Sequence, residues 1–250
     1  MARELFRINP ALDRGTLAAT FARDGVVQVR DVLTAEAASN LLAVLSRDTP
    51  WGLAWQAGAQ GPNALRAADL ARLPSGEAQR IGTETDIAMR NGEYAFRFAQ
   101  YPMLAAYLGR WDPGSPHELL LEHLNDAPFL DLVREITAIP ELVKADAQAT
   151  LYAPGHFLAQ HDDSHVGQGW RVAYVLNVCG AEWRADWGGY LEFYDEAGDV
   201  VRGFRPRFNA LNLFLVPRRH AVTMVASFAP SAVCDHRMVA RPLASRRASG

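Results

Sequence analysis

The sequence contains few cysteines, a single lysine and no long apolar run. The cysteines, Cys179 and Cys234, do not form a CxxC pair and are too few for a disulfide framework, so we expect small buried residues in a reducing compartment. No stretch approaches the roughly 20 apolar residues that a membrane span needs. The N-terminus also lacks the basic start and apolar run of a signal peptide. These absences predict a soluble, cytoplasmic protein.

Neither sign of charge dominates. The formal net charge is -3, and the basic residues are nearly all arginine, with Lys144 as the exception. This balance gives no reason to expect general attraction to nucleic acid or to an anionic membrane, so we expect neither as a partner. The 250 residues are 49% hydrophobic, which is sufficient for one domain with a buried core.

The first part of the chain predicts helices and loops after an opening strand. Residues 24–33 are a β-branched run entered from Asp-Gly, and residues 33–47 show helical spacing with Thr34 as N-cap. Glycine and proline predict loops over residues 48–80, with a brief helix at 64–73. Residues 94–144 are predicted to be helical, before a turn that leads into a strand.

From residue 149 onward the pattern changes to short alternating runs. They are ATLYA, WRVAYVLNV, GYLEFYD, NALNLFLV, AVTMVASF and HRMVARPL, separated by Gly, Pro, Asp or Asn. Many short strands at close spacing indicate a barrel or two-sheet sandwich rather than a parallel sheet. We therefore predict a mainly β, α+β single domain, with supporting helices, loops and the opening strand over 1–148, the main β-core over 149–243 and a disordered tail at 244–250.

The stretch HDDSH, residues 161–165, offers candidate metal ligands. Strand alternation aims residues i and i+2 at one face, so His161 and Asp163 point together and Asp162 points away. His220, beside another predicted strand, is placed to supply a third ligand, and two histidines with one carboxylate suit a non-haem Fe(II) oxygenase. A lone HxD is also common in solvated turns. The remaining candidate ligands are His156, His165 and His236.

Six blocks of the sequence together resemble a known family. They are YAPGHFLAQHDDSH, WRVAYVLNV, WRADWGGYLEFYD, FRPRFNALNLFLV, HAVTMV and HRMVARPL. Their order and spacing are similar to the prolyl-hydroxylase-like dioxygenases that depend on 2-oxoglutarate and Fe(II). The resemblance covers roughly residues 150–241. It implies a double-stranded β-helix, a jelly-roll barrel, with His161, Asp163 and His220 as iron ligands and catalytic centre.

The resemblance also implies residues that bind the co-substrate. A basic residue clamps the far carboxylate of 2-oxoglutarate, and Arg237 matches it, although the segment before it is longer than in the family. Arg241 competes for this role, because an even separation aims both arginines at one face. Tyr152 matches a tyrosine that helps to hold the co-substrate, or it is a packing residue. Asn177 occupies a position that is often tyrosine in relatives.

The activity implied by the resemblance is hydroxylation of a C–H bond, with O2 consumed and 2-oxoglutarate converted to succinate, and with ascorbate as a further expected factor. The leading expectation is a prolyl residue in a protein substrate, of which the translation machinery is one source. A free amino acid or other small molecule is the alternative, and a non-catalytic jelly-roll binding module is a third. The segment 50–100 is expected to hold the lid, with Arg90, Tyr94 and Arg97 as substrate contacts or ordinary surface residues.

Overall fold

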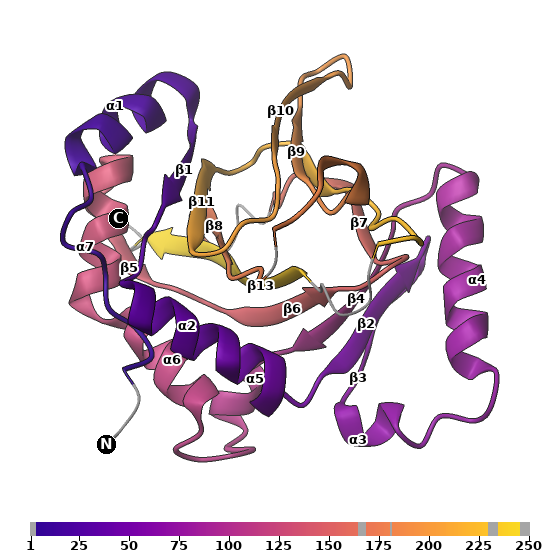
Figure 1. Ribbon diagram of the computed structural model, residues 1–250. Coiled ribbons are helices and arrows are strands. Elements are labelled where there is room, and N and C mark those ends of the chain that lie inside the picture. Colours follow the sequence, from indigo (N-terminus) through magenta and orange to yellow (C-terminus); the bar gives the residue numbers. More distant parts are fainter. Residues whose placement is uncertain (1–3, 165–168, 181, 230–234, 246–250) are drawn as a thin grey trace, which may run out of the picture.

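The computed structural model describes residues 4–164, 169–180, 182–229 and 235–245, and for 235–245 it describes the backbone but not the side chains. Figure 1 shows a strongly curved sheet with helices gathered on one side and a single long helix, α4, on the other. Every strand pair recorded is antiparallel, and the sheet has 13 strands. The predicted α+β class with a jelly-roll core is confirmed.

The sheet folds into two facing walls. The order of the first wall is β1 (Val26–Arg30), β11 (Ala210–Leu215), β8 (Trp170–Asn177), β13 (Asp235–Ser245), β6 (Gln148–Tyr152), β4 (Ala95–Tyr101), β2 (Gly52–Ala57) and β3 (Gln60–Leu65). The second wall contains β7 (Phe157–His161), β12 (His220–Val222), β9 (Leu191–Tyr194) and β10 (Val200–Phe204). Because β4 pairs with both β6 and β7, it joins the two walls. The short β5 (Leu142–Lys144) pairs with β13.

The helices cover the outer face of the first wall. They are α1 (Arg14–Asp24), α2 (Ala35–Ala43) with its π-helical end (Val44–Asp48), α5 (Met103–Leu108), α6 (Pro116–Asn125) and α7 (Ala127–Thr137). Their apolar stripes, including Leu41 and Val133, pack against outward-facing strand residues such as Leu176 and Leu213. The inward-facing residues of the same strands, such as Val175 and Phe214, form a separate cluster inside the barrel. Alternation along each strand therefore divides an outer core from the barrel interior.

The opening strand and helix agree with the sequence prediction. The strand is β1, and the Thr34 side chain accepts a hydrogen bond from the backbone N–H of Ala37 at the start of α2. The helix α1, before the strand, was not predicted. At the other end, β13 continues to Ser245, so two residues of the predicted tail belong to the sheet, and 246–250 lie outside the described residues.

The prediction of loops over residues 48–80 is wrong for most of the segment, while the brief helix predicted at 64–73 is confirmed as α3 (Ala67–Leu70). The segment contains the hairpin of β2 and β3, then α3 and the start of α4 (Glu77–Arg90). The glycines that suggested loops serve the hairpin instead, because a Cβ on Gly52 would lie 2.0 Å from the carbonyl oxygen of Leu65, and Gly58 at the turn has φ 57°. Part of the helical prediction for 94–144 is also wrong. The strand β4 is buried at five of seven positions, so its apolar run lacks a clean alternation.

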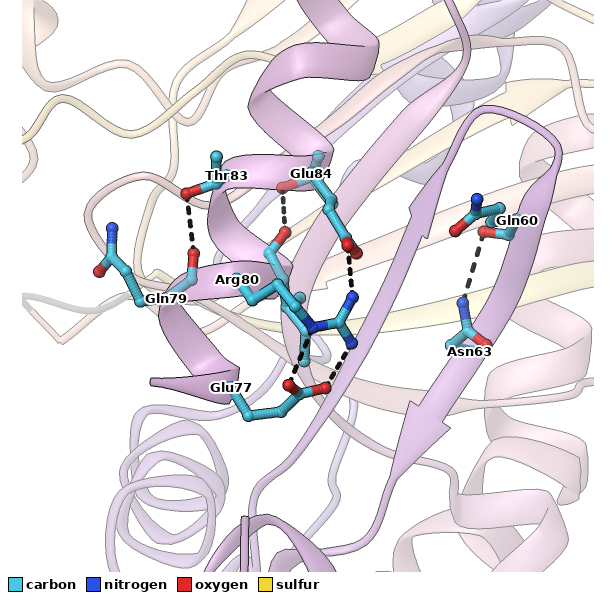
Figure 2. A network of polar contacts seen from close by, with 9 residues as sticks. Gln60, Asn63, Glu77, Gln79, Arg80, Thr83 and Glu84 are labelled. Carbon is cyan, nitrogen blue, oxygen red and sulfur yellow. Dashed lines mark hydrogen bonds and ion pairs between the residues drawn. The ribbon is translucent and has the colours of Figure 1, made fainter. Parts of the chain in front are cut away.

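Helix α4 packs against the barrel through buried residues such as Ala88, and one arginine of the barrel hydrogen-bonds to it. Its exposed face carries Arg80 paired with Glu77 and Glu84, an arrangement drawn in Figure 2 that adds little stability in solvent. By contrast, the half-buried Arg97 of β4 donates to the carbonyl of Gly82 at 2.8 Å and to the Thr85 hydroxyl at 2.6 Å. It also donates to the carbonyl of Gly155 at 2.8 Å. Arg97 thus ties α4 to the turn between β6 and β7. This turn leads into β7, the strand that ends at His161.

We predict that Arg97→Met lowers the free energy of unfolding by about 2–4 kcal/mol, because it leaves two carbonyls without their charged donor. Urea denaturation measures this loss. The matched control is Arg90→Met at the end of the same helix, whose side chain is exposed and makes one contact with the Asp86 carbonyl at 3.2 Å. The control changes stability by less than about 0.5 kcal/mol. Equal losses in the two variants contradict the role assigned to Arg97.

Candidate metal centre and its cavity

The structure brings His161, Asp163 and His220 together. His161 is the last residue of β7 and His220 the first of β12, and the two are directly opposite in the antiparallel register, with ring centroids 4.1 Å apart. Asp163 follows two residues after His161, beyond the end of the strand. Its φ is 56°, in the left-handed region that a residue with a side chain rarely adopts. Strand alternation is therefore the wrong reason for the His161–Asp163 pairing, because a turn of the backbone brings the carboxylate back.

Backbone carbonyls fix which ring nitrogens face the centre of this group. The Nδ1 of His161 lies 3.0 Å from the Ala159 carbonyl, and the Nδ1 of His220 lies 2.7 Å from the Arg218 carbonyl. A carbonyl oxygen only accepts hydrogen bonds, so each Nδ1 carries the proton and each Nε2 presents a lone pair. Metal-binding histidines typically have such a partner on the second nitrogen.

The two Nε2 atoms converge on the carboxylate of Asp163. The Nε2 of His161 is 3.4 Å from Oδ1, and the Nε2 of His220 is 3.6 Å from Oδ2. One atom from each residue lies within 4.8 Å of the others. Two nitrogen lone pairs and a carboxylate that face one another are all electron donors, and a cation between them stabilises the group. The residues present therefore fit a divalent metal. Two imidazoles and one carboxylate on one side of an ion are the donor set of non-haem Fe(II) oxygenases.

The surroundings of His220 keep its imidazole neutral. The residue is 5% exposed and packs against the ring of Phe214, with centroids 4.7 Å apart. Burial, followed by the neighbouring His161, lowers the pKa of His220 to about 4. A metal ion therefore does not compete with a proton for this nitrogen at neutral pH.

A cavity of about 890 Å³ contains the three residues. One side is formed by the interior of β8 and β11, with Ala173, Val175 and Phe214. The opposite side is an aromatic row that begins at Tyr94, just before β4, and continues through Phe96 and Phe98 on β4, with centroids 6.0 and 5.3 Å apart. Burial and the charge of Asp163 raise the pKa of Tyr94 to about 12, so its hydroxyl stays protonated beside the centre.

The predicted co-substrate residues differ in how they lie relative to the cavity. Tyr152 lines the cavity, is 1% exposed and packs on Phe98 with centroids 5.4 Å apart. Asn177 is also buried inside the barrel, but it is not among the lining residues described, and its Oδ1 has no hydrogen-bond partner in the part of the chain that the structure describes. On β13, the backbone of Arg237 is opposite Asn177 and Thr150. The side chains of Arg237 and Arg241 lie outside those described.

The remaining residues singled out from the sequence have other surroundings. His156 sits in the turn between β6 and β7, where its Nδ1 meets the backbone of Ala153 and Leu151. Asp162 lines the cavity and accepts a hydrogen bond from the backbone N–H of Ser164. His165 and the side chain of His236 lie outside the described residues.

The aromatic row was missed as part of the site. Of its three residues, Tyr94 alone is singled out from the sequence, as a substrate contact or an ordinary surface residue. The signal was present, because Tyr94, Phe96 and Phe98 recur at every second residue and therefore share one face of a strand. The expected lid within 50–100 is a wall of the cavity built from β2, β3 and β4.

Comparison with known proteins agrees with this geometry. The family model described as the 2OG-Fe(II) oxygenase superfamily matches residues 147–240, the segment that contains all three residues of the centre. Over this segment the chain is similar to the 2OG-Fe(II) oxygenase superfamily, and its core has the double-stranded β-helix fold. No curated protein sequence matches the chain significantly.

Solved structures share the fold at low sequence identity. A Pseudomonas putida prolyl-4-hydroxylase is 16% identical over 92% of this chain and 98% of its own, with a TM-score of 0.55. A 2OG-Fe(II) oxygenase family oxidoreductase from Burkholderia pseudomallei is 15% identical over 99% and 100%, also at 0.55. A Trichoplax adhaerens prolyl hydroxylase in complex with a hypoxia inducible factor peptide is 12% identical over 92% and 88%, at 0.58. These similarities establish the fold.

We predict that Asp163→Ala lowers the affinity for Mn(II), used as an oxygen-stable probe, by at least about 100-fold, because it removes the one anionic ligand. Isothermal titration calorimetry measures the change. Asp162→Ala, one residue earlier and with its carboxylate engaged by the Ser164 N–H, is the matched control and retains the wild-type affinity. If Asp162→Ala weakens Mn(II) binding as much as Asp163→Ala does, the assignment of the centre is wrong.

Proposed function

We propose that this chain is a 2-oxoglutarate- and Fe(II)-dependent dioxygenase that hydroxylates a prolyl residue in a protein substrate. The observation that carries the oxygenase activity is the convergence of two Nε2 lone pairs and one carboxylate at one end of a cavity. When bound, Fe(II) and 2-oxoglutarate supply the oxidising chemistry: O2, 2-oxoglutarate and R–H give R–OH, succinate and CO2.

The protein's own side chains hold and shield the reacting groups. His161, Asp163 and His220 would hold the ion, and all three line the cavity in which co-substrate and substrate would bind. Phe214 and Val222, which line the cavity beside His220, exclude water from that side. We assign the binding of the far carboxylate of 2-oxoglutarate to Arg237, because a guanidinium both neutralises and orients a carboxylate. Tyr152, which lines the cavity, is assigned a supporting contact to the same co-substrate.

The lining of the cavity favours a peptide over a free amino acid. Among the described lining residues there is no lysine or arginine, while four amide side chains are present: Gln56, Asn63, Gln100 and Gln148. A free amino acid carries a carboxylate of its own, which needs a cation in addition to the one that holds 2-oxoglutarate. A segment of protein chain presents neutral amides, which hydrogen-bond to amide side chains. Two of the structural neighbours are prolyl hydroxylases, and this supports proline as the target.

We predict that the purified protein, supplied with Fe(II) and ascorbate, converts 2-oxoglutarate to succinate, and that proline-containing peptides stimulate this conversion more than free proline does. Succinate is quantified by mass spectrometry, and added oxygen is located in the peptide by fragmentation. Stimulation by free amino acids alone favours the small-molecule alternative. Absence of turnover together with absence of iron retention leaves a non-catalytic binding module.

We predict that Arg237→Ala weakens 2-oxoglutarate binding by about 30-fold or more, because a buried carboxylate loses its charged partner. Arg241→Ala, four residues later on the same strand, is the matched comparison and has a small effect. The affinity is measured by calorimetry with Mn(II) present. If only Arg241→Ala weakens binding, Arg241 holds the co-substrate and the assignment to Arg237 is wrong.

A further inference from the structure

The strand β3 has one open edge. Among the described residues it pairs only with β2, so it ends that side of the sheet. The carbonyl oxygen of Leu65 faces β2, since a Cβ on Gly52 would lie 2.0 Å from it. Successive residues of a strand direct their backbone groups to opposite sides. The N–H and C=O of Ala64 therefore point away from β2, as does the carbonyl of Pro62.

This open edge borders the cavity that holds the metal centre. Pro62, Asn63 and Ala64 all line the cavity, and Ala54 and Gln56 of β2 continue the same wall toward Phe96 and His161. Figure 1 shows β3 beyond β2. Figure 2 shows the hairpin from close by, with the Asn63 side-chain amide donating to the carbonyl of Gln60 in the same strand. A chain laid along the edge of β3 would run beside the entrance to the centre.

The edge lacks the charged protection common on edge strands. Natural edges are often guarded by charged side chains, whereas the sequence of β3, QGPNAL, has none. Another strand that ends the sheet, β10 in the second wall, carries Arg202 and a break in its pairing between Val200 and Arg202. Pro62 has no backbone N–H, so it offers no donor along the open edge of β3. Ala64 still offers both its N–H and its C=O for hydrogen bonds to another strand.

We propose that the protein substrate docks as an extended strand on the edge of β3, hydrogen-bonded to the backbone N–H and C=O of Ala64, and that this docking delivers the target residue into the cavity. The inference rests on the proposed function, because it concerns the same peptide substrate. Addition of a strand to an open edge is a recurring mode of peptide recognition, in which backbone bonds supply affinity and side-chain pockets supply selectivity.

The chemistry of the site defines the kind of peptide. The residue before a proline is itself held in extended backbone, so a proline-containing segment matches the strand geometry at low entropic cost. The charged groups among the described lining residues are Asp162 and Asp163. One metal ion offsets the latter, and the former favours a neutral or basic segment over an acidic one.

The test uses a synthetic library of randomised peptides that each contain one central proline, with added oxygen detected by mass spectrometry. KM and kcat are then measured for the sequence that wild-type protein oxidises best. Ala64→Pro removes the outward N–H and raises KM about tenfold, the scale of one lost backbone hydrogen bond, with little change in kcat. Ala64→Gly keeps the N–H, and its KM stays within about twofold of wild type.

Val201→Pro is the matched control for a proline placed on an edge strand, because Val201 lies in the irregular step of β10, which ends the second wall of the sheet. It leaves KM unchanged. Amide hydrogen exchange of wild-type residues 60–65, with and without the same peptide, gives an independent answer if Ala64→Pro does not fold. The exchange slows at Ala64 when the peptide binds.

The outcomes separate the two proposals. If wild-type protein oxidises no library peptide, the prolyl function fails, and docking on β3 fails with it. If peptides are oxidised but Ala64→Pro and Ala64→Gly have the same KM, docking on β3 alone is overturned. Unchanged exchange at Ala64 in the presence of an oxidised peptide overturns it equally.

Discussion

The antiparallel pairing of β7 with β12 is the constraint on which the site depends. It sets His161 directly opposite His220. The carbonyls of Ala159 and Arg218, each two residues before its histidine, accept a hydrogen bond from the Nδ1–H of that histidine. A shift of one residue in this register would turn one imidazole to the other face of the sheet. Asp163 completes the group only because its backbone adopts a left-handed turn just after β7.

The rest of the barrel gives this centre an asymmetric environment. On one side, Phe214 and its neighbours bury His220 and keep it neutral, while amide and aromatic side chains of β2, β3 and β4 line the cavity elsewhere. Arg97 of β4 hydrogen-bonds to α4 and to the turn before β7. The chemistry and the recognition surface therefore share one strand, β4, which joins the two walls of the sheet.

Much of the core could be predicted from the sequence, because short alternating runs indicate strands with one buried face. The HxD motif and the distal histidine indicate the type of metal ligand. The hairpin of β2 and β3 could not, since its glycines and Pro62 are the residues that also punctuate loops. The pairing of His161 with Asp163 was right for the wrong reason, because alternation fails where a residue leaves the strand. Register places the backbone of Arg237 beside Asn177, which spacing alone did not reveal.

The central claim is that one metal ion lies between His161, Asp163 and His220, with 2-oxoglutarate on its cavity side. Crystals grown with Mn(II) and 2-oxoglutarate, measured at the manganese absorption edge, test it most directly. The account predicts one strong anomalous peak within bonding distance, about 2.0–2.3 Å, of both Nε2 atoms and of the Asp163 carboxylate. A peak bound elsewhere, or ordered 2-oxoglutarate with no metal between these three side chains, would contradict it.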